Sequence, residues 1–521
     1  MFGLPRILAV LLAIHVALFA WHSLGFTRHF SLDSMNYVDV ARNIGAGRGI
    51  TQTTLGSNQY RLDPDAEPPI PFVAQPPLYP IAIAGLARIG LSEENGALLI
   101  GALAYGLVLL LSFSLGRRFA GDAAGAVALG VAAIHYPLAG VSRYALSDTM
   151  GLMLALLSLL LVSAGGARGP VMLFPAGLAA GLAFATRYAL APFAVAGVFA
   201  LARKGPRSIA GLLAFLVGFG IPAAVVLVRN AAVSGALMPE LGPSQAGLFE
   251  NAGRMALALV PWLADPGRVS LFAQALVIFV SVALAARFMR KRVKKGADGP
   301  PASAEPVALF GTAIVFYTVF LVAQRTRFHF DEIDPRLALP AALSLVLLLA
   351  IAFARRAAIS REAGIRLGAG FLLLAIGGQA ARIVQADPQP PVSPGRMEQI
   401  EWIAGNTNPG DWIVGEDTFD VTFLLRRDRV VSFSQYPYTE FMTYDRLLAI
   451  RDAKAVQGAK LYLVLRADPE LDEEEWRDRY GDFIADLMLG RVIDYEEVGR
   501  LAGTPDSGPG VFLVQPKRTT R

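Results

Sequence analysis

The sequence predicts an α-helical polytopic membrane protein of about 11 transmembrane helices, followed by an α/β domain at the C-terminal end. Of the 521 residues, 54% are hydrophobic and only 17% are charged, and the mean hydropathy is +0.48. Soluble proteins carry about 25% charged residues, so a composition this apolar requires lipid as part of the solvent. Long apolar runs fill the first 385 residues, whereas short strand-like runs follow residue 395.

The apolar runs define the expected spans, because a membrane-crossing helix needs about 20 apolar residues, with a range of about 17 to 25. The candidate spans are 7–25, 96–116, 122–140, 148–164, 171–187, 189–203, 209–228, 270–288, 307–323, 337–354 and 367–385. The first is interpreted as an uncleaved helix, because no small-x-small cleavage site precedes a polar mature start. The short runs 171–187 and 189–203 are interpreted as two passes, because Arg168 before them and LARKGPR after them both look cytoplasmic.

Charge predicts the orientation of these helices. Residues 388–521 carry 16 Lys and Arg against 23 Asp and Glu, so the first 387 residues hold a net charge of +12. The basic residues gather in GRRFAG at 116–121, RFMRKRVKKG at 287–296 and ARRAAISREAGIR at 354–366. Basic loops stay inside, so we expect a cytoplasmic N-terminus, an extracytoplasmic C-terminus and a location in the cell inner (plasma) membrane. This distribution explains the positive net charge without a nucleic-acid partner.

Composition also divides the chain into domains. We expect a transmembrane domain over 1–386, whose outer loop 26–95 holds interfacial helices, a proline-rich linker over 387–395, and an extracytoplasmic α/β domain over 396–521. In the last segment the strand-like runs DWIVGE, RVVSFS, AKLYLVLR and GVFLVQP alternate with helical patterns. The chain has no cysteine, which excludes disulfides, thiol catalysis and thiolate metal sites.

The first candidate site residue is Asp33, in the stretch SLDSMNYVDVARNIGAG. The stretch predicts a short amphipathic helix that begins at Ser31 or Asp33, so Asp33 could be no more than a helix cap. Alternatively, a carboxylate at the membrane surface could act as a general base. A hydroxyl is a poor nucleophile, and a carboxylate about 3 Å away can take its proton during attack.

Two further candidates lie at the ends of spans. Asp148, in SRYALSD, is expected at the outer mouth of a helix, where the helix dipole favours an acid and capping is the simpler explanation. Ionisable residues near membrane depth are nevertheless functional candidates. Arg187, at the break in FATRYALAP, could extend its charge to the interface or bind a phosphate in a forked geometry.

A charged loop, QRTRFHFDEIDPR at 324–336, supplies the remaining candidates. Its basic members are Arg325, Arg327, His329 and Arg336, and its acids are Asp331, Glu332 and Asp334. These charges either pair with one another or form a cationic wall for an anionic leaving group. Two segments between the first and second spans carry further predictions. Residues 72–90, FVAQPPLYPIAIAGLARIG, predict a helix in the membrane interface. The loop 49–71 is long enough to be a lid.

The order of these weak motifs resembles that of a known family. Asp33 and Tyr37 are followed by PPLYP at 76–80, a span ending in GRRF, then Asp148, GLAAGLAFATRYALAP, IPAAVVLVRNAAVSGALMP and DPRLALPAAL. This pattern resembles the GT-C glycosyltransferases of the protein-mannosyltransferase and lipid A aminoarabinose-transferase type, and the resemblance covers the whole chain.

The resemblance implies a reaction and roles for particular residues. It implies transfer of a sugar from a polyprenyl-phosphate donor to a lipid, glycan or protein acceptor at the extracytoplasmic, periplasmic side of the cell envelope. Asp33 would be the catalytic base, Asp148 a second catalytic carboxylate, and Arg187 a ligand of the donor phosphate. The residues expected to contact substrate are Tyr37, Gln75, Tyr79, Arg187, Arg325, Arg327, His329 and Arg336. Asp33 and Asp148 could also hold Mg²⁺ or Mn²⁺, since hard cations prefer oxygen ligands.

The chain departs from the family at three positions. Ser34 follows Asp33 where relatives commonly have a second acid, Gln75 stands where aminoarabinose transferases have a lysine, and their late RY motif is Arg336-Leu337 here. Two other functions are considered, a secondary transporter and a non-catalytic membrane scaffold. Transporters place ionisable residues near the midplane and often contain repeats, whereas here the acids lie at outer helix mouths and no repeat is visible.

Overall fold

The structure is a computed structural model in which the chain forms two compact units, each described here by itself. The first comprises Met1–Thr27, Ala97–Arg229 and Ser244–Pro388, and the second comprises Arg28–Gly96, Asn230–Pro243 and Gln389–Arg521. The residues described are 5–25, 30–56, 67–165, 173–203, 209–239, 243–244, 246–259, 304–328, 330–385, 392, 394–416, 418–433, 442–455, 459–465, 477, 481–488, 498–502 and 511–514.

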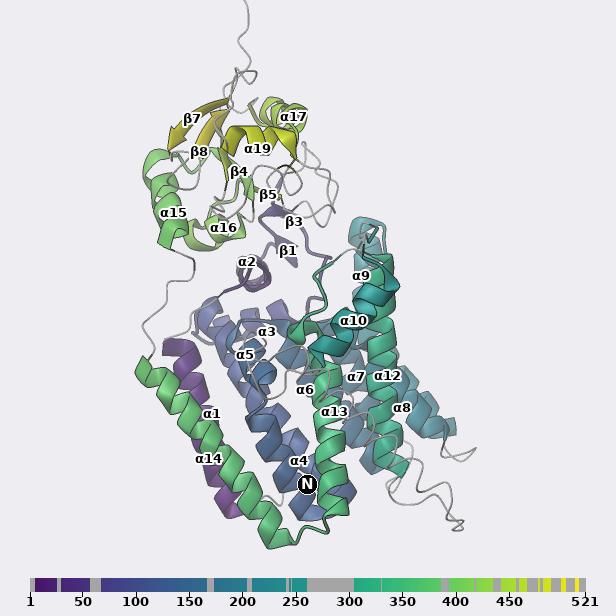
Figure 1. Cartoon of the computed structure of the whole chain (residues 1–521). Coiled ribbons are helices and arrows are strands. Elements are labelled where there is room, and N and C mark those ends of the chain that lie inside the picture. Colours follow the sequence, from purple (N-terminus) through teal and green to yellow (C-terminus); the bar gives the residue numbers. More distant parts are fainter. Residues whose placement is uncertain are drawn as a thin grey trace, which may run out of the picture. The chain divides into compact units, whose positions relative to one another are not determined.

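The first unit is built from helices (Figure 1). They are α1 (Arg6–Gly25), α4 (Glu93–Ala133, which begins in the second unit), α5 (Tyr136–Arg143), α6 (Ser147–Gly165), α7 (Phe174–Thr186), the 3₁₀ turn η2 (Tyr188–Leu190), α8 (Ala191–Ala202), α9 (Ile209–Ser234, which ends in the second unit), α10 (Leu248–Ala258), α12 (Ala304–Arg327), α13 (Pro335–Arg356) and α14 (Arg361–Gln385). Among the described helices, α1, α4, α6, α9, α12, α13 and α14 are long and apolar enough to cross a membrane. The chain is therefore a multi-pass membrane protein.

The observed helices refine the expected spans. α4 is two helices joined at Ala120 and Gly121, whose backbone angles are not helical, and Gly121 has φ = 81°. The second of these helices ends at Ala133 instead of reaching residue 140, because His135 accepts a hydrogen bond from the Leu138 amide and starts α5. The expected spans 171–187 and 189–203 contain only the short helices α7 and α8. The expected span 270–288 lies outside the described residues, so the structure does not establish a count of 11.

Small residues allow the helices of the first unit to approach one another closely. A Cβ atom added at Gly177 of α7 would lie 1.9 Å from the Phe215 carbonyl oxygen of α9, and one at Gly368 of α14 would lie 2.4 Å from the Ala126 oxygen of α4. Such contacts between backbones are how helices associate in lipid, where no hydrophobic force drives them together. α1 and α14 also pack side by side (Figure 1).

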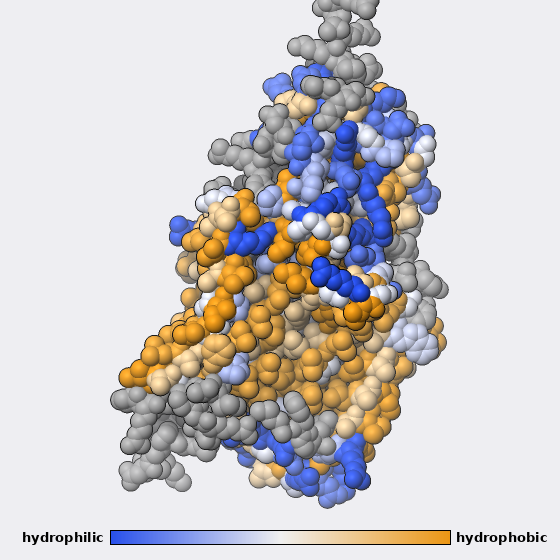
Figure 2. Space-filling model, turned by 180° about the vertical axis from the view of Figure 1, so that it is seen from behind, coloured by the Kyte–Doolittle hydropathy of each residue, from blue (hydrophilic) through white to orange (hydrophobic). Residues whose placement is uncertain are grey.

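The outer surface of these helices is apolar. Figure 2 shows hydrophobic side chains over this part of the chain. On α9 the exposed large hydrophobic residues are Ile209, Leu213, Leu216, Val217, Ile221, Val225, Val228 and Val233. A surface of this kind is stable against lipid and would be unfavourable in water.

The second unit combines the first outer loop with the C-terminal tail. Its elements are α2 (Leu32–Gly45), β1 (Thr51–Gln52), β2 (Leu55–Gly56), β3 (Ile70–Pro71), α3 (Leu78–Ala87), α15 (Pro394–Asn406), β4 (Trp412–Glu416), α16 (Phe419–Leu425), β5 (Val430–Phe433), α17 (Tyr444–Ala455), β6 (Leu461–Val464), α19 (Asp482–Met488), β7 (Val498–Ala502) and β8 (Val511–Val514). The sequence-based division assigns residues 26–95 to the transmembrane domain, whereas here most of them pack with the tail.

A six-stranded sheet organises this unit, in the order β2-β5-β4-β6-β8-β7. The first four strands are parallel, and β8 and β7 run antiparallel to their neighbours. β2 joins the edge through the pairing of Leu55 with Val431. Side chains alternate between two cores, because successive strand residues point to opposite faces: Trp412 and Val414 lie in one core with residues of α17 and α19, and Ile413 lies in the other with residues of α15 and α16.

Candidate functional site

Asp33 lies in the first turn of α2 and is not its cap. The N-cap is Ser31, whose hydroxyl accepts from the Ser34 amide, while the Ser34 hydroxyl accepts from the Ser31 amide. This reciprocal pair satisfies the end of the helix. The Asp33 carboxylate is therefore not needed as the cap, and it lies in a position that the helix dipole favours for an anion.

Asp33 contacts another of the residues predicted from the sequence. Gln75 Nε2 donates a hydrogen bond of 2.9 Å to Asp33 Oδ1, although the two residues are 42 positions apart. Both side chains are half-buried. Gln75 thus fixes the direction of the carboxylate, at the position where aminoarabinose transferases carry a lysine.

The two tyrosines predicted to contact substrate are buried in the packing between α2 and α3. Tyr37 and Tyr79 are buried, and their rings meet edge to face with centroids 5.1 Å apart. Phe72 packs edge to face on Tyr37 at 6.3 Å. In this structure the tyrosines hold α2 against α3, which positions the segment that carries Gln75 next to Asp33. A role in substrate contact stays a prediction.

In the first unit, Asp148 and Arg187 form an ion pair. Asp148 lies in the first turn of α6, and Arg187 lies at the break between α7 and η2 in extended backbone. Arg187 Nη1 donates to Asp148 Oδ2 at 2.7 Å, and the two side chains are 18% and 6% exposed. Helices α6 and α7 pack together, so the break in the chain brings the guanidinium to the mouth of α6. The two residues, 39 positions apart in the sequence, are brought together as a unit.

The charged loop near residue 330 has mixed contacts. Arg325 is buried, with its Nη1 donating to Ser244 Oγ at 2.9 Å and its guanidinium 5.9 Å from the centre of the Phe330 ring. Arg327 lies over the Phe328 ring at 5.1 Å.

The acids of the same loop have separate partners. Arg336 pairs with Asp331, and Glu332 pairs with Arg254 of α10. Asp334 caps α13 by accepting from the Leu337 amide at 2.8 Å. Of the two alternatives for this loop, pairing between its own charges is observed for Arg336 and Asp331. His329 lies outside the described residues.

Metal binding finds no support in the described part of the chain, where no three His, Asp or Glu side chains gather as ion ligands. Asp33 lies with Gln75 in one unit, and Asp148 lies with Arg187 in the other.

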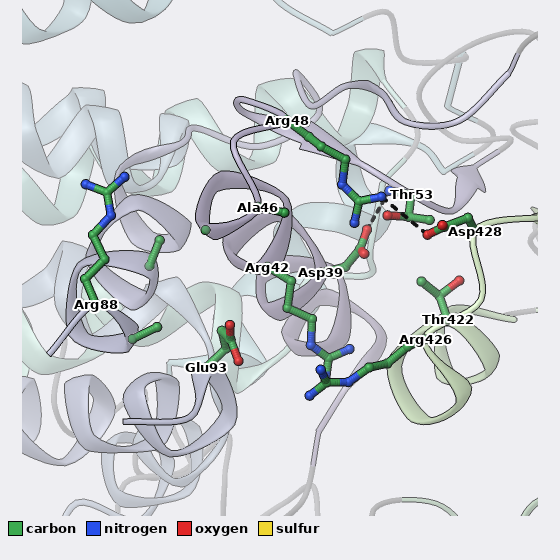
Figure 3. A pocket seen from close by; sticks show the side chains of 13 residues that line it. Asp39, Arg42, Ala46, Arg48, Thr53, Arg88, Glu93, Thr422, Arg426 and Asp428 are labelled. Atoms are coloured by element: carbon green, nitrogen blue, oxygen red, sulfur yellow. Dashed lines mark hydrogen bonds and ion pairs between the residues drawn. The ribbon is translucent and has the colours of Figure 1, made fainter. Parts of the chain in front are cut away.

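Sequence reasoning missed a pocket in the second unit (Figure 3). Its volume is about 460 Å³, and it is lined by Asp39, Arg42, Gly45, Ala46, Arg48, Thr53, Ala84, Ala87, Arg88, Glu93, Thr422, Arg426 and Asp428. The signal in the sequence was the run of Asp39, Arg42 and Arg48 behind Asp33. The remaining walls come from α3, the start of α4 and the end of α16, which no local pattern connects.

Asp39 is the buried acid of this pocket. Its Oδ2 accepts a hydrogen bond of 2.6 Å from the Thr53 amide. Burial raises the pKa of the Asp39 carboxyl to about 6, against the opposing effects of the Thr53 hydrogen bonds and of the charges on Arg42 and Arg48. Arg42 in turn donates to the Phe423 carbonyl oxygen at 2.9 Å and pairs with Glu94.

Comparisons with known proteins identify this architecture. Residues 74–229 match the family model described as dolichyl-phosphate-mannose-protein mannosyltransferase. The crystal structure of ArnT from Cupriavidus metallidurans bound to undecaprenyl phosphate is similar over 98% of each chain, with a TM-score of 0.57 and 14% identity. The same protein in the apo state is similar over 97% of each chain, with a TM-score of 0.55 and 15% identity. No curated protein sequence matches the chain. The chain therefore has the fold of the solved ArnT structures, and residues 74–229 within it match the protein-mannosyltransferase family model.

Proposed function

We propose that the chain is an integral-membrane glycosyltransferase that moves a sugar from a polyprenyl-phosphate donor to an acceptor hydroxyl on the extracytoplasmic face. The matched family model is named for a dolichyl-phosphate mannose donor, and the similar ArnT structure holds undecaprenyl phosphate. The acceptor is a lipid, a glycan or a protein. The distribution of basic residues supports a cytoplasmic N-terminus and an extracytoplasmic tail in the inner membrane.

The observation that carries the proposal is the hydrogen bond from Gln75 to Asp33. A general base must be held within hydrogen-bond reach of the proton it takes. The capping box of α2 leaves the Asp33 carboxylate out of the helix cap, and Gln75 orients it. A carboxylate held in one direction by this hydrogen bond is suited to take the proton of a bound hydroxyl.

The proposed step balances as follows. Asp33 takes the proton of the acceptor hydroxyl while the acceptor oxygen attacks the anomeric carbon of the donor sugar. The bond between that carbon and the lipid phosphate breaks, and its electron pair leaves on the phosphate oxygen. The products are the glycosylated acceptor and a polyprenyl phosphate, and Asp33 then loses its proton to solvent.

Arg187 is the residue that we propose binds the donor phosphate. A guanidinium has five N–H donors in a planar fork that matches phosphate oxygens, and its position at a helix break leaves it 18% exposed. Asp148, the second predicted catalytic carboxylate, holds this guanidinium in place through Nη1. Arg325, Arg327 and Arg336 stay predicted contacts of the donor.

A requirement for Mg²⁺ or Mn²⁺ also stays a prediction, and no step here runs through a metal. Measuring transfer with and without EDTA tests it. If transfer activity is retained in EDTA, the reaction does not require a divalent cation.

The test compares the wild type with Asp33→Asn in vesicles that contain labelled polyprenyl-phosphate sugars and a cell-envelope acceptor fraction. We expect label to move to the acceptor with the wild type and to fall by about 10²- to 10⁴-fold with Asp33→Asn. Asp445→Asn, which removes an exposed carboxylate of α17 in the same unit, should transfer like the wild type. Gln75→Ala should lower the rate about 10- to 100-fold, because a hydrogen bond to a charged group is lost.

The outcomes separate the alternatives. Equal transfer by Asp33→Asn and the wild type would show that Asp33 is not the base. No transfer by the wild type with any donor in the panel would favour a transporter or a scaffold.

A further inference from the structure

The pocket lined by Asp39, Arg42 and Arg426 lies on a different face of α2 from Asp33. In an α-helix each residue turns by about 100°, so Asp39 and Arg42, six and nine positions after Asp33, lie at roughly 240° and 180° from it. Both line the pocket, and Asp33 and Gln75 do not. The pocket is therefore separate from the site proposed for catalysis, although α2 carries both.

The lining of the pocket is rich in arginine. Arg42, Arg48, Arg88 and Arg426 line it from α2, the following loop, the end of α3 and the end of α16. Figure 3 shows Arg42 and Arg426 directed toward one another, whereas Arg88 points away from them. Arg48, Arg88 and Arg426 are exposed, so water screens the repulsion between their guanidinium groups and their N–H donors are accessible to a ligand.

The acids of the lining offset only part of this charge. Arg48 meets Asp428 at 3.5 Å, and the two side chains are 38% and 64% exposed, so this ion pair is weak. Neither Arg88 nor Arg426 has an ion pair with any residue in the part of the chain that the structure describes. Asp39 and Glu93 are the other acids of the lining, so four arginines meet three carboxylates there.

The backbone at Arg426 is a second, independent observation. Arg426 is the residue after α16 and has φ = 52°, in the left-handed region. Glycine is the usual residue at this position because it has no Cβ to strain. A strained arginine where glycine would fit indicates that its side chain is needed there. The C-terminal end of α16 favours a cation as well, but that effect does not require the left-handed backbone.

We propose that this pocket binds a phosphate group, at a site distinct from the one that contains Asp33. Arginine forks match phosphate oxygens in paired hydrogen bonds, and a volume of about 460 Å³ accommodates the group that bears the phosphate. Small side chains, Ala46, Ala84 and Ala87, form the remaining wall. The proposal does not depend on the transfer reaction. A lipid headgroup and a soluble phosphate ester share this chemistry, and the test separates them.

The test measures ligand binding to the purified full-length chain in detergent micelles. The probes are inorganic pyrophosphate and phosphatidylglycerol, each titrated at constant ionic strength against sodium chloride and phosphatidylcholine as blanks, and binding is read from thermal unfolding and calorimetry. We expect at least one probe to bind saturably. Binding of pyrophosphate indicates a soluble phosphate ester, and binding of phosphatidylglycerol alone indicates a lipid headgroup.

Variants make the test specific. Arg426→Gly should weaken binding of the same probe about tenfold or more without lowering the unfolding temperature, because glycine is preferred at φ = 52°. Arg48→Gln should weaken it as well. Arg366→Gln removes an exposed arginine of α14 and should leave binding unchanged. The proposal fails if neither probe binds the wild type, or if Arg426→Gly and Arg48→Gln bind as tightly as Arg366→Gln.

Discussion

The buried carboxyl of Asp39 makes the stability of the protein depend on pH. Burial raises its pKa from 3.8 to about 6 in the folded protein. The folded protein therefore binds this proton more tightly than the unfolded chain does. The resulting stability is fully present below about pH 4 and is lost as the pH rises through about 6.

The magnitude follows from the size of this change. At about 1.4 kcal/mol per pH unit, the free energy of unfolding should fall by about 3 kcal/mol across this window. Asp39→Asn keeps an oxygen that can accept from the Thr53 amide and removes the ionisable proton. The variant should match or trail the wild type near pH 4 and exceed it by up to about 3 kcal/mol at pH 7 and above.

The assay is thermal unfolding of both proteins in the same detergent from pH 4 to 8. For a chain of this length the difference in unfolding temperature should change by about 3 °C over the window. Asp445→Asn serves as the control, since that carboxylate is exposed and its curve should run parallel to that of the wild type. Parallel curves for Asp39→Asn and the wild type would refute the reasoning that burial raises this pKa.

Two other predictions concern the helices of the first unit. Asp148→Asn and Arg187→Gln should each lower the free energy of unfolding by about 3 kcal/mol, because each breaks an ion pair that is largely withdrawn from water. The double variant should recover part of this loss, and additive losses in denaturation would contradict an ion pair. Gly177→Ala should lower the free energy of unfolding by about 1–3 kcal/mol, because the new methyl group meets the Phe215 oxygen. Gly220→Ala, where no atom lies within 4 Å of the new Cβ, should be neutral or slightly stabilising, and equal effects at the two glycines would contradict the packing described.

The sequence predicted local features well where one segment carries the whole signal. The motif SLDS predicted the start of α2 with Ser31 or Asp33 as its cap, and the structure selects Ser31, because capping residues act on the next three amides. The basic run containing Arg117 and Arg118 predicted an end between two helices, and the structure has a break there at Ala120 and Gly121. The helix end near residue 133 was missed, because His135 acts as a cap through a ring nitrogen and histidine is an uncommon cap.

The candidate site was predictable in its parts and not in its contacts. Asp33, Gln75 and Arg187 were all named from the sequence, and so was Asp148. No local pattern pairs Asp33 with Gln75, or Asp148 with Arg187, because each pair is joined by the packing of separate segments. The tyrosines of α2 and α3 were named as substrate contacts, and their burial was not foreseen.

The sequence by itself determined that this chain is embedded in a membrane and that most of it is helical. Those properties depend on the apolarity and length of single segments, which are local. Only the tertiary structure decided that the first outer loop joins the sheet of the tail and that arginines from distant segments line one pocket. Arg42 bonds to Phe423 across 381 positions, and β2 pairs with β5 through two residues. Such contacts form only when the whole unit folds, so the hydrophobic periodicity of either segment does not predict them.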